Sequence, residues 1–464
     1  MTTAGPARHP THVRSLSAPA APDIPLQPLW ELDLSDAEAE RISQLIDEEL
    51  KKEQQRRKEA RKKEIKVMLL GQAESGKSTL QKQFQLYYAS QTLEHERPSW
   101  RPIVYFNIIK AVRMTLDELD YLFAAQASGN AEVVDSEIDR PTPEMLEEIL
   151  AIRGRLLPLI AIESSLAFEL SGGVSVIGGR SDVFVRGGWQ ALTSRGRSGH
   201  DVSTPPNKTV AVTNLAARTL NENCSDVQAL WKQPVVQNLV RLQKLKLDES
   251  APFFLHNIER VAEPDYLPTT DDILNVRLQT LGVTEHIFDI VVAGSRYMWK
   301  LYDVGAGTAI CKQRHAWVPY FDDATAIIFL APLSAFDQYL DEDMKTNRID
   351  DSLQLFTAIC TNQLLKNTHL VLLLNKVDLL KKKLEAGLKV RKYITSYGHR
   401  PNRYEDVAEY FRAHFVQVHK KKDISRRSLY VHFTSMLDIK ATQGIIINVG
   451  EAIIRSHIAK TGLA

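Results

Sequence analysis

Cysteine is scarce in this sequence, with three residues in 464, at Cys224, Cys311 and Cys360. Their spacing forms no C-x-x-C pair and no paired framework, so the sequence predicts neither a disulfide scaffold nor a zinc site. We therefore expect a reducing compartment. An uninterrupted apolar run of about 18 residues is also missing, as is a basic-then-apolar leader, which argues against a membrane-spanning helix and a secretory signal.

The sequence also lacks an excess of charge of either sign. The 58 Lys and Arg nearly balance the 57 Asp and Glu and leave a net charge of +1, which excludes a chain-wide basic character meant for nucleic acid. Hydrophobic residues make up 44% and charged residues 25%, so wholesale disorder is excluded as well. At about 150 residues per domain, the length gives a prior of about three domains.

The N-terminal part of the chain divides in two. Residues 1–34 are predicted to form a disordered tail, because six of the 20 prolines lie in the first 28 residues and no hydrophobic period is present. At Ser35, which forms a capping-box pattern with Glu38, apolar residues at helical spacing begin and predict one long helix over residues 35–64.

This leading helix is divided by charge. Residues 35–50 carry six acids and one Arg, whereas residues 51–66 carry nine Lys and Arg against three Glu. A solvated helix is one interpretation of such runs. The apolar stripe favours a second interpretation, a surface for a protein partner, with the basic half available to acidic lipid.

Short apolar stretches that alternate with helical patterns predict an α/β sheet with helices on both faces. The expected strands are Ile65–Leu70, His286–Ala293, Tyr297–Val304, Ala324–Leu330, His369–Leu374 and Leu429–Phe433. Residues 89–271 show helical patterns and no convincing strand, so we expect a helical domain inserted into an α/β domain of residues 65–88 and 272–464. Eight glycines within residues 171–199 predict a flexible insert over about 171–214.

A phosphate-binding motif follows the first expected strand. Gly71-Gln72-Ala73-Glu74-Ser75-Gly76-Lys77-Ser78 fits G-x-x-x-x-G-K-S/T and precedes a helical stretch. In this motif backbone N–H groups converge on phosphates, Lys77 reaches the β and γ oxygens, and the Ser78 hydroxyl ligates Mg²⁺. The sequence therefore predicts phosphate binding, and the motif leaves the base open.

A second motif, Asn375-Lys376-Val377-Asp378, follows the expected strand His369–Leu374. Ligands of such sheets bind at the carboxyl ends of the strands. A carboxylate at Asp378 can accept hydrogen bonds from N1–H and N2–H₂ of guanine, which adenine does not offer. Together with the phosphate motif, this pattern predicts selection of GTP over ATP and argues against a P-loop ATPase or kinase.

With both motifs in place, the sequence resembles a heterotrimeric G-protein alpha subunit from about Ser35 to its end, except for the glycine-rich insert. The carriers of the resemblance include Lys63-Glu64-Ile65-Lys66, Glu74-Ser75-Gly76-Lys77-Ser78-Thr79, Leu230-Trp231-Lys232, Tyr266-Leu267-Pro268-Thr269, Asp272-Ile273-Leu274, Asp303-Val304-Gly305 and His432-Phe433-Thr434. The resemblance implies a Ras-like domain interrupted by an all-helical one, with GTP or GDP and Mg²⁺ bound between them.

Carried over by position, the resemblance makes Arg277 the catalytic arginine finger that stabilises charge on the γ-phosphoryl group. It implies metal ligation by Ser78 and Thr280, with Asp303 acting through water, and an ion pair between Glu249 and Lys376 across the cleft. The implied nucleotide contacts are Glu74, Ser75, Gly76, Lys77, Ser78, Thr79, Ser250, Leu274, Arg277, Thr280, Asp303, Ala306, Asn375, Lys376, Asp378 and Met436.

Departures from the family pattern affect the chemistry. Ala306 stands where the family has a glycine that donates to the γ-phosphate, and Gly307 replaces the glutamine that orients the attacking water. We therefore expect GTP binding with slow hydrolysis. In the first loop, Gln72 and Ala73 replace Ala and Gly, and Ala73 would resist a positive φ. In the first switch, Asn275, Gln279 and Leu281 replace Arg, Lys and Thr.

The resemblance also implies partners, namely a βγ complex and a G-protein-coupled receptor, at the cytoplasmic face of the plasma membrane. The effector cannot be named. Thr2 replaces the glycine that myristoylation needs, and no cysteine lies near the N-terminus for palmitoylation, so we expect weak or indirect membrane contact. Two functions stay open: a signalling GTPase, and a guanine-nucleotide-binding module that barely hydrolyses and acts as a scaffold or decoy for βγ.

Overall fold

The computed structural model describes residues 36–127, 142–171, 184–185, 189, 208–242, 244–245, 247–280, 282–292, 294–304, 324–340 and 343–461. The chain divides into two compact units, Met1–Lys62 and Lys63–Ala464, and each is described by itself. The predicted tail, residues 1–34, lies outside the described residues, as do Ala306 and Gly307.

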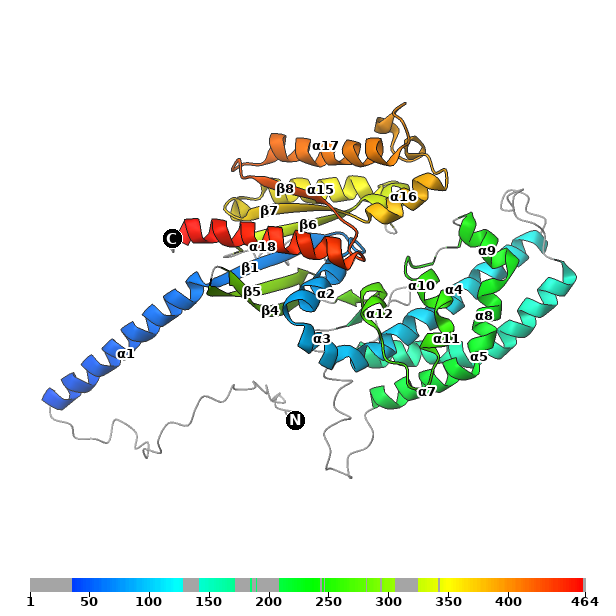
Figure 1. Ribbon diagram of the computed structural model, residues 1–464, viewed down its shortest axis with the longest axis horizontal. Coiled ribbons are helices and arrows are strands. Elements are labelled where there is room, and N and C mark those ends of the chain that lie inside the picture. The colour runs from blue at the N-terminus through cyan, green and yellow to red at the C-terminus, as the bar shows by residue number, and fades with distance from the viewer. Residues whose placement is uncertain are drawn as a thin grey trace, which may run out of the picture. The chain divides into compact units, whose positions relative to one another are not determined.

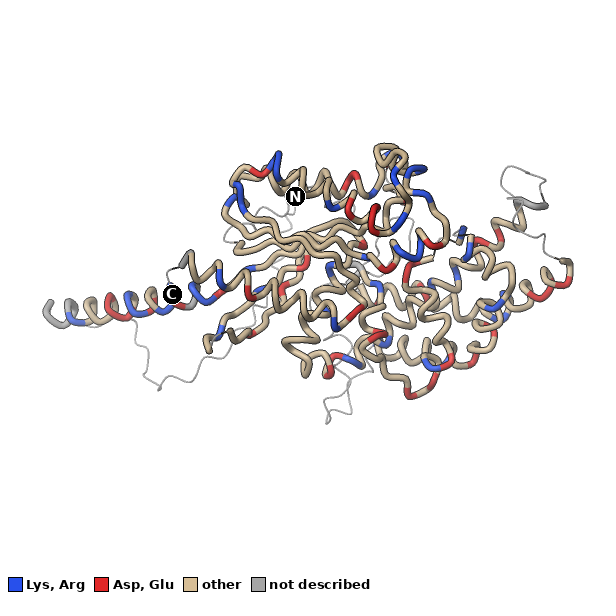
Figure 2. The backbone as a smooth tube through the Cα atoms, turned by 45° about the horizontal axis from the view of Figure 1, so that its top comes forward, with Lys and Arg blue, Asp and Glu red and all other residues tan. Residues whose placement is uncertain are grey.

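The first unit contributes one helix, α1 (Asp36–Lys62). It ends two residues before the predicted limit at Glu64, because Glu64 already belongs to the first strand of the second unit. The backbone trace in Figure 2 marks the positions of acidic and basic residues along this helix. Leu45 and Leu50 are more than half exposed, so the apolar stripe is not covered within this unit.

The second unit is built around a sheet of six strands in the order β4-β5-β1-β6-β7-β8 (Figure 1). The strands are β1 (Glu64–Gly71), β4 (Val283–Val292), β5 (Ser295–Val304), β6 (Ala326–Pro332), β7 (His369–Asn375) and β8 (Leu429–Phe433). All neighbouring pairs are parallel except β4 and β5, which form an antiparallel hairpin. Each expected strand is confirmed, with ends shifted by up to three residues.

Strand register places the site at one edge of this sheet. β1 pairs with β5 so that Leu69 lies opposite Asp303, and with β6 so that Gly71 lies opposite Leu330. β6 in turn places Pro332 opposite Asn375 of β7. The carboxyl ends of these parallel strands therefore meet at the edge where ligands of open α/β sheets bind.

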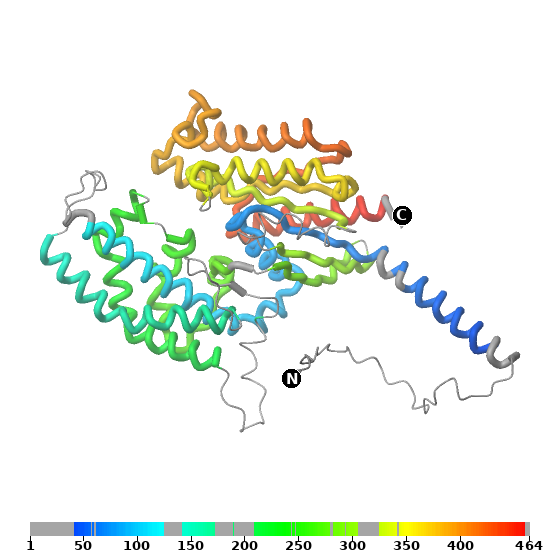
Figure 3. Tube along the Cα trace, turned by 180° about the vertical axis from the view of Figure 1, so that it is seen from behind, coloured from blue at the N-terminus to red at the C-terminus, as the bar shows by residue number. Residues whose placement is uncertain are grey.

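Helices cover both faces of the sheet (Figures 1 and 3). One face packs against α15 (Arg348–Thr361), α16 (Val377–Glu385) and α17 (Tyr404–Lys422), around buried residues such as Phe356 and Phe415. The other face packs against α2 (Lys77–Tyr88) and α18 (Ile439–Thr461), around residues such as Phe84 and Trp299. Short 3-10 turns connect the elements: η4 (Leu333–Asp337), η5 (Gln363–Leu365), η6 (Val390–Lys392) and η7 (Thr395–Tyr397).

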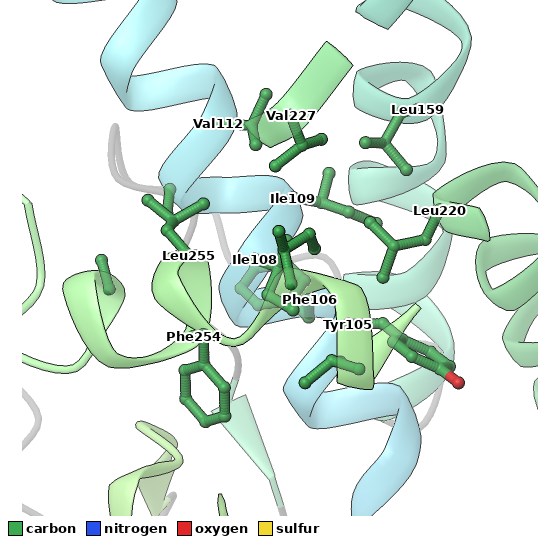
Figure 4. Packing of buried hydrophobic residues seen from close by; sticks show 14 of the residues in the cluster. Tyr105, Phe106, Ile108, Ile109, Val112, Leu159, Leu220, Val227, Phe254 and Leu255 are labelled. Atoms are coloured by element: carbon green, nitrogen blue, oxygen red, sulfur yellow. The ribbon is translucent and has the colours of Figure 1, made fainter. Parts of the chain in front are cut away.

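A helical domain is inserted between α2 and β4. Its elements are α3 (Ser90–Glu96), η2 (Arg97–Trp100), α4 (Arg101–Ala127), α5 (Pro143–Leu170), α7 (Lys208–Glu222), α8 (Cys224–Lys232), α9 (Pro234–Arg241), α10 (Ala251–His256), α11 (Ile258–Val261) and α12 (Thr270–Asn275). The helices enclose a continuous apolar core, in which Ile109 of α4 lies near Leu159 of α5 and Leu220 of α7 (Figure 4). Phe254 of α10 belongs to the same core.

Two observations correct the predicted insert over 171–214. Helix α7 begins at Lys208, where Thr209, Thr213 and Ala216 supply a buried stripe at helical spacing that packs beside α5. In addition, β2 (Phe184–Val185) pairs in parallel with β3 (Gln279–Thr280), although the sequence showed no convincing strand in this domain. The remaining insert residues between 172 and 207, apart from Trp189, lie outside the described residues.

Within the described ranges, no helix is both long and apolar enough to cross a membrane.

Candidate nucleotide site

One pocket lies where the carboxyl edge of the sheet faces the helical domain. Its walls come from the phosphate loop, from the segment that links α12 to β3, from the ends of β5 and β7, and from the loop after β8. The lining residues are Ala73, Glu74, Gly76, Lys77, Ser78, Thr79, Glu249, Ser250, Leu274, Asn275, Val276, Arg277, Leu278, Asp303, Asn375, Lys376, Asp378, Leu379, Ser435, Met436 and Leu437. Residues about 360 positions apart in sequence thus share one cavity.

The phosphate loop has the tight backbone that its sequence predicts. Gly76 has a φ of 100°, and a Cβ there would lie 2.3 Å from Nδ2 of Asn375. A Cβ on Gly71 would lie 2.4 Å from the carbonyl oxygen of Leu330. Only glycine fits such positions without displacing neighbours, so the loop packs its backbone closely against the ends of β6 and β7.

The predicted restriction at Ala73 is not met in the structure. Among the described non-glycine residues, positive φ falls on Glu74, Lys376 and Arg426. Ala73 therefore needs no left-handed conformation, and Glu74 carries the strain of the loop with a φ of 62°.

Lys77 lies at the first turn of α2 and is buried. Its Nζ donates to the carbonyl oxygens of Gly71 at 3.0 Å and Gln72 at 2.7 Å. The ammonium group thus lies inside the loop and among the pocket-lining residues, where phosphate oxygens would be its strongest acceptors.

Two predicted metal residues come together beside the loop. The Ser78 hydroxyl donates to Oδ2 of Asp303 at 2.7 Å, and Asp303 is buried at the end of β5. Hydroxyl and carboxylate oxygens are ligands that Mg²⁺ prefers. Thr280 is placed through its backbone, which pairs with Val185, and nothing is described of its side chain.

Asn375 ties two loops of the pocket together. Its Nδ2 donates to the carbonyl oxygen of Ser75 at 2.8 Å, and its Oδ1 accepts from the Thr434 hydroxyl at 3.1 Å. Asp378, three residues on, lines the cavity and is only partly buried. The structure therefore gives Asn375 a supporting position and leaves the Asp378 carboxylate accessible to a base.

The ion pair across the cleft is confirmed, since Nζ of Lys376 donates to Oε2 of Glu249. Lys376 follows β7, whereas Glu249 belongs to the helical domain, so the pair joins the two sides of the pocket. Ser250 lines the same side as Glu249. Met436, on the loop after β8, is buried, and its carbonyl oxygen accepts from Nε2 of Gln83 at 2.8 Å.

Arg277 extends from the segment between α12 and β3 toward the phosphate loop. Its Nη2 donates to Oε1 of Glu74 at 2.6 Å, and its Nη1 donates to Asp248. Asn107 of α4 holds the backbone: its Oδ1 accepts from the Arg277 N–H at 2.8 Å, and its Nδ2 donates to the Arg277 carbonyl at 2.9 Å. The guanidinium group thus lies over the loop that would hold phosphates.

Comparison with known proteins decides the family. A family model described as G-protein alpha subunit matches residues 40–453. The chain belongs to this family. It is 31% identical to the guanine nucleotide-binding protein alpha-4 subunit of Mycosarcoma maydis over 86% of this chain and 83% of that protein. It is 29% identical to the guanine nucleotide-binding protein alpha-1 subunit of the same organism, over 92% of this chain and 98% of that protein. It is 27% identical to the guanine nucleotide-binding protein subunit alpha-13 of Mus musculus, over 91% of this chain and 92% of that protein.

Membership fixes several coarse properties of this alpha subunit. It is a guanine nucleotide-binding protein with a Ras-like domain and a helical domain. Members of the family are GTPases that bind guanine nucleotides and typically Mg²⁺.

Glu74 of the phosphate loop forms ion pairs with two arginines in this alpha subunit. It contacts Arg277 on one side and Arg348 on the other, with Arg348 Nη1 at 3.3 Å from its Oε2. Burial raises the pKa of Glu74, but the charges of Arg277, Arg348 and Lys376 outweigh it and lower the pKa to about 2. The carboxylate therefore stays ionised and holds the guanidinium of Arg277 in place.

Several residues of the site escaped the sequence analysis. Arg348, at the start of α15, also donates to the Ala73 carbonyl at 2.8 Å. Gln72, one of the departures from the family, donates to Asp351 one turn further along the same helix. Asn107 and Asp248 hold Arg277. The only sequence signal is at Asn107, a lone amide within the apolar run from Ile103 to Ile109.

Of the remaining predicted site residues, Thr79 and Leu274 line the pocket, and Ser75 is buried within the loop. Ala306 and Gly307, which carry the prediction of slow hydrolysis, lie outside the described residues.

Proposed function

We propose that this alpha subunit is a GDP/GTP switch that binds its nucleotide in the pocket between the Ras-like and helical domains. The observation that carries the proposal is the convergence of three independent elements on one cavity: the phosphate loop, the Asn375–Asp378 motif and Arg277. Residues of the phosphate loop and of the base motif line the same pocket, where Asn375 joins them by a direct hydrogen bond to Ser75.

The base would be selected by Asp378. Its carboxylate would accept from N1–H and N2–H₂ of guanine, whereas adenine presents no matching pair of donors. Lys376 would cover one face of the base and is steadied by Glu249. The backbone N–H groups around Met436 would donate to guanine O6.

The phosphates would lie on the loop between Gly71 and α2. Loop N–H groups, the N-terminus of α2 and the Lys77 ammonium together provide the donors for three phosphate groups. Mg²⁺ fits the oxygen ligands beside them and would be held by Ser78 and Thr280, with Asp303 acting through water. When bound, the ion neutralises charge on the phosphate oxygens.

Hydrolysis would transfer the γ-phosphoryl group to water, with GDP and phosphate as products. Arg277 would stabilise the negative charge that develops during this transfer, since its guanidinium already lies over Glu74 of the loop. The chain has Gly307 where a glutamine would orient water and Ala306 where a glycine would approach the γ-phosphate. We therefore propose that hydrolysis is slow while GTP binding is retained.

The proposed partners follow from the family. A βγ complex would bind the GDP form, and a G-protein-coupled receptor would promote exchange at the cytoplasmic face of the plasma membrane. The exposed Leu45 and Leu50 of α1 support a protein contact along that helix. Its basic half supports a weak additional attraction to acidic lipid.

A second function is favoured by Ala306 and Gly307. If water is not positioned at all, the protein would be a regulatory module that stays loaded with GTP or acts as a scaffold for βγ. The two functions differ in one measurable quantity, the rate of GTP turnover.

Binding is tested by displacing a fluorescent guanine nucleotide from the purified full-length protein with GTP or with ATP in the presence of Mg²⁺. The proposal predicts displacement by GTP at far lower concentration than by ATP. Equal displacement by both nucleotides would contradict it.

A further inference from the structure

The glycine-rich insert makes a contact with the catalytic segment that the proposed function does not use. Phe184 and Val185 of β2 pair in parallel with Gln279 and Thr280 of β3. The motifs that carry the family resemblance all lie outside this insert. The contact therefore belongs to a part of the chain on which the family resemblance does not rest.

The insert is anchored close to this strand pair. Trp189, four residues after β2, is 6% exposed and belongs to the core of the helical domain. Its ring meets Trp100 edge to face, with ring centroids 4.9 Å apart. A buried aromatic pair of this geometry fixes a short segment firmly, because both rings lose contact area if it detaches.

Trp100 connects this anchor to the Ras-like domain. Nζ of Lys82, on α2, lies 4.8 Å from the Trp100 ring and donates to the carbonyl oxygens of Ile273 at 2.7 Å and Val276 at 3.0 Å. Val276 precedes Arg277, whose N–H and carbonyl are held by Asn107. The backbone from residue 273 to 280 is thus held from three sides.

From these contacts we infer that Phe184, Val185 and Trp189 form a positioning segment for the nucleotide site. The β2 strand holds β3, and thereby keeps Arg277 at the pocket and fixes the backbone at Thr280. The inference rests on the proposed function, in which Arg277 acts on the γ-phosphoryl group and Thr280 ligates Mg²⁺.

The strand pair also bridges the two domains. Along the chain, β2 comes between helices α5 and α7 of the helical domain, whereas β3 is separated from β4 of the Ras-like sheet by two residues. The nucleotide pocket has walls from both domains, so releasing a nucleotide requires the walls to part. Because β3 is two residues from β4, a parting that moves β3 with the Ras-like sheet would break the β2–β3 pair, and this pair would therefore slow nucleotide release.

The test compares two double variants of the full-length protein. Phe184→Pro with Val185→Pro removes both backbone N–H donors of β2, whereas Phe184→Ala with Val185→Ala changes the same side chains and keeps the donors. The measured quantity is the dissociation rate of a fluorescent, non-hydrolysable GTP analogue over a range of Mg²⁺ concentrations.

We expect the proline pair to release the analogue about tenfold faster than the parent, and the alanine pair to stay within about twofold. We also expect that the double proline variant needs about tenfold more Mg²⁺ than the parent to slow dissociation of the analogue by half of the maximal effect, because β2 no longer holds the backbone at Thr280. A loss of general stability alone would speed release equally at all Mg²⁺ concentrations. An unchanged rate, or equal acceleration in both variants, would overturn the inference.

A second pair of variants covers the case in which the proline chain fails to fold. Trp189→Ala removes the anchor and Trp189→Phe keeps an aromatic ring. Faster release with alanine and parental release with phenylalanine supports the inference, whereas parental release in both overturns it. A parent protein that does not bind the guanine analogue contradicts the proposed function instead, so the two failures are distinguishable.

Discussion

Replacing Gly76 by alanine tests the geometry of the phosphate loop most sharply. Gly76 has a φ of 100°, and the added Cβ would lie 2.3 Å from Nδ2 of Asn375. The amide must then move away, which breaks its hydrogen bonds to the Ser75 carbonyl at 2.8 Å and to Thr434 at 3.1 Å. One added methyl group thus breaks the hydrogen bonds by which Asn375 joins the phosphate loop to the loop after β8.

The magnitude follows from two costs. A non-glycine residue held at such a φ costs about 1–3 kcal/mol. A buried hydrogen bond broken with its partners left unpaired costs about 1–3 kcal/mol more. Together they amount to about 2–6 kcal/mol. Because the nucleotide-free loop can relax in part, we take the lower end of this range, about 2 kcal/mol, which corresponds to an affinity for a guanine nucleotide that is about thirtyfold lower or more.

The assay is titration of a fluorescent GTP analogue with Mg²⁺, alongside the thermal midpoint of the nucleotide-free protein. Gly387→Ala is the matched control, since Gly387 has a φ of 88° and a Cβ there meets no atom within 4 Å. That variant should lose stability through strain alone and keep its affinity within about twofold. An affinity of Gly76→Ala within threefold of the parent would refute the reasoning.

Three further predictions concern the base, the cleft and a buried lysine. Asp378→Ala should abolish the preference for GTP over ATP in competition binding, and a preserved preference would remove Asp378 as the base-selecting residue. Glu249→Gln should speed nucleotide release at low salt, because it removes the ion pair with Lys376 across the pocket. We expect only about a two- to fivefold change, since the pair is partly exposed and screened by salt. Equal release rates of parent and variant at low salt would contradict a role for the pair. Burial, opposed by Asp303, lowers the pKa of Lys82 from 10.5 to about 7, so at intermediate pH the unfolded chain holds more protons than the folded chain and stability rises with pH. The thermal midpoint of the parent relative to Lys82→Met should therefore increase from pH 7 to pH 9, and a constant difference would contradict a buried, titrating lysine.

The sequence predicted the local elements of the site well. Strand β1, the phosphate loop and the start of α2 could be inferred because a strand, a glycine loop and a helix follow one another within 25 residues, Glu64–Tyr88. The Asn375–Asp378 motif could be inferred in the same way, since it directly follows β7. The buried strands also stood out, because β6 and β7 are almost continuously apolar.

Long-range pairings were mostly beyond the sequence. The contact of Arg277 with Glu74 spans 203 positions, and that of Asn375 with Ser75 spans 300. A pattern along the chain carries no information on which polar groups meet across a cleft. For the same reason Arg348 and Asp248 went unnoticed, whereas the Glu249–Lys376 pair was found only through the family resemblance.

The insert shows where composition misleads. Its glycines predicted a loop, yet β2 and Trp189 make ordered contacts there. A two-residue strand has no periodicity to detect, and its pairing partner is 95 positions away, from Phe184 to Gln279. The start of helix α7 at Lys208 was missed because the buried face of its first turns consists of Thr209, Thr213 and Ala216. In the sequence, these small and polar residues resemble a loop.

The most direct test of the account is the nucleotide that the purified protein holds after loading with GTP and Mg²⁺, recovered and identified over time. We predict that guanine nucleotide is recovered in stoichiometric amount and that GTP persists far longer than on an ordinary member of the family. Recovery of no guanine nucleotide would contradict the pocket assignment. Conversion to GDP at an ordinary family rate would contradict the proposed consequence of Ala306 and Gly307.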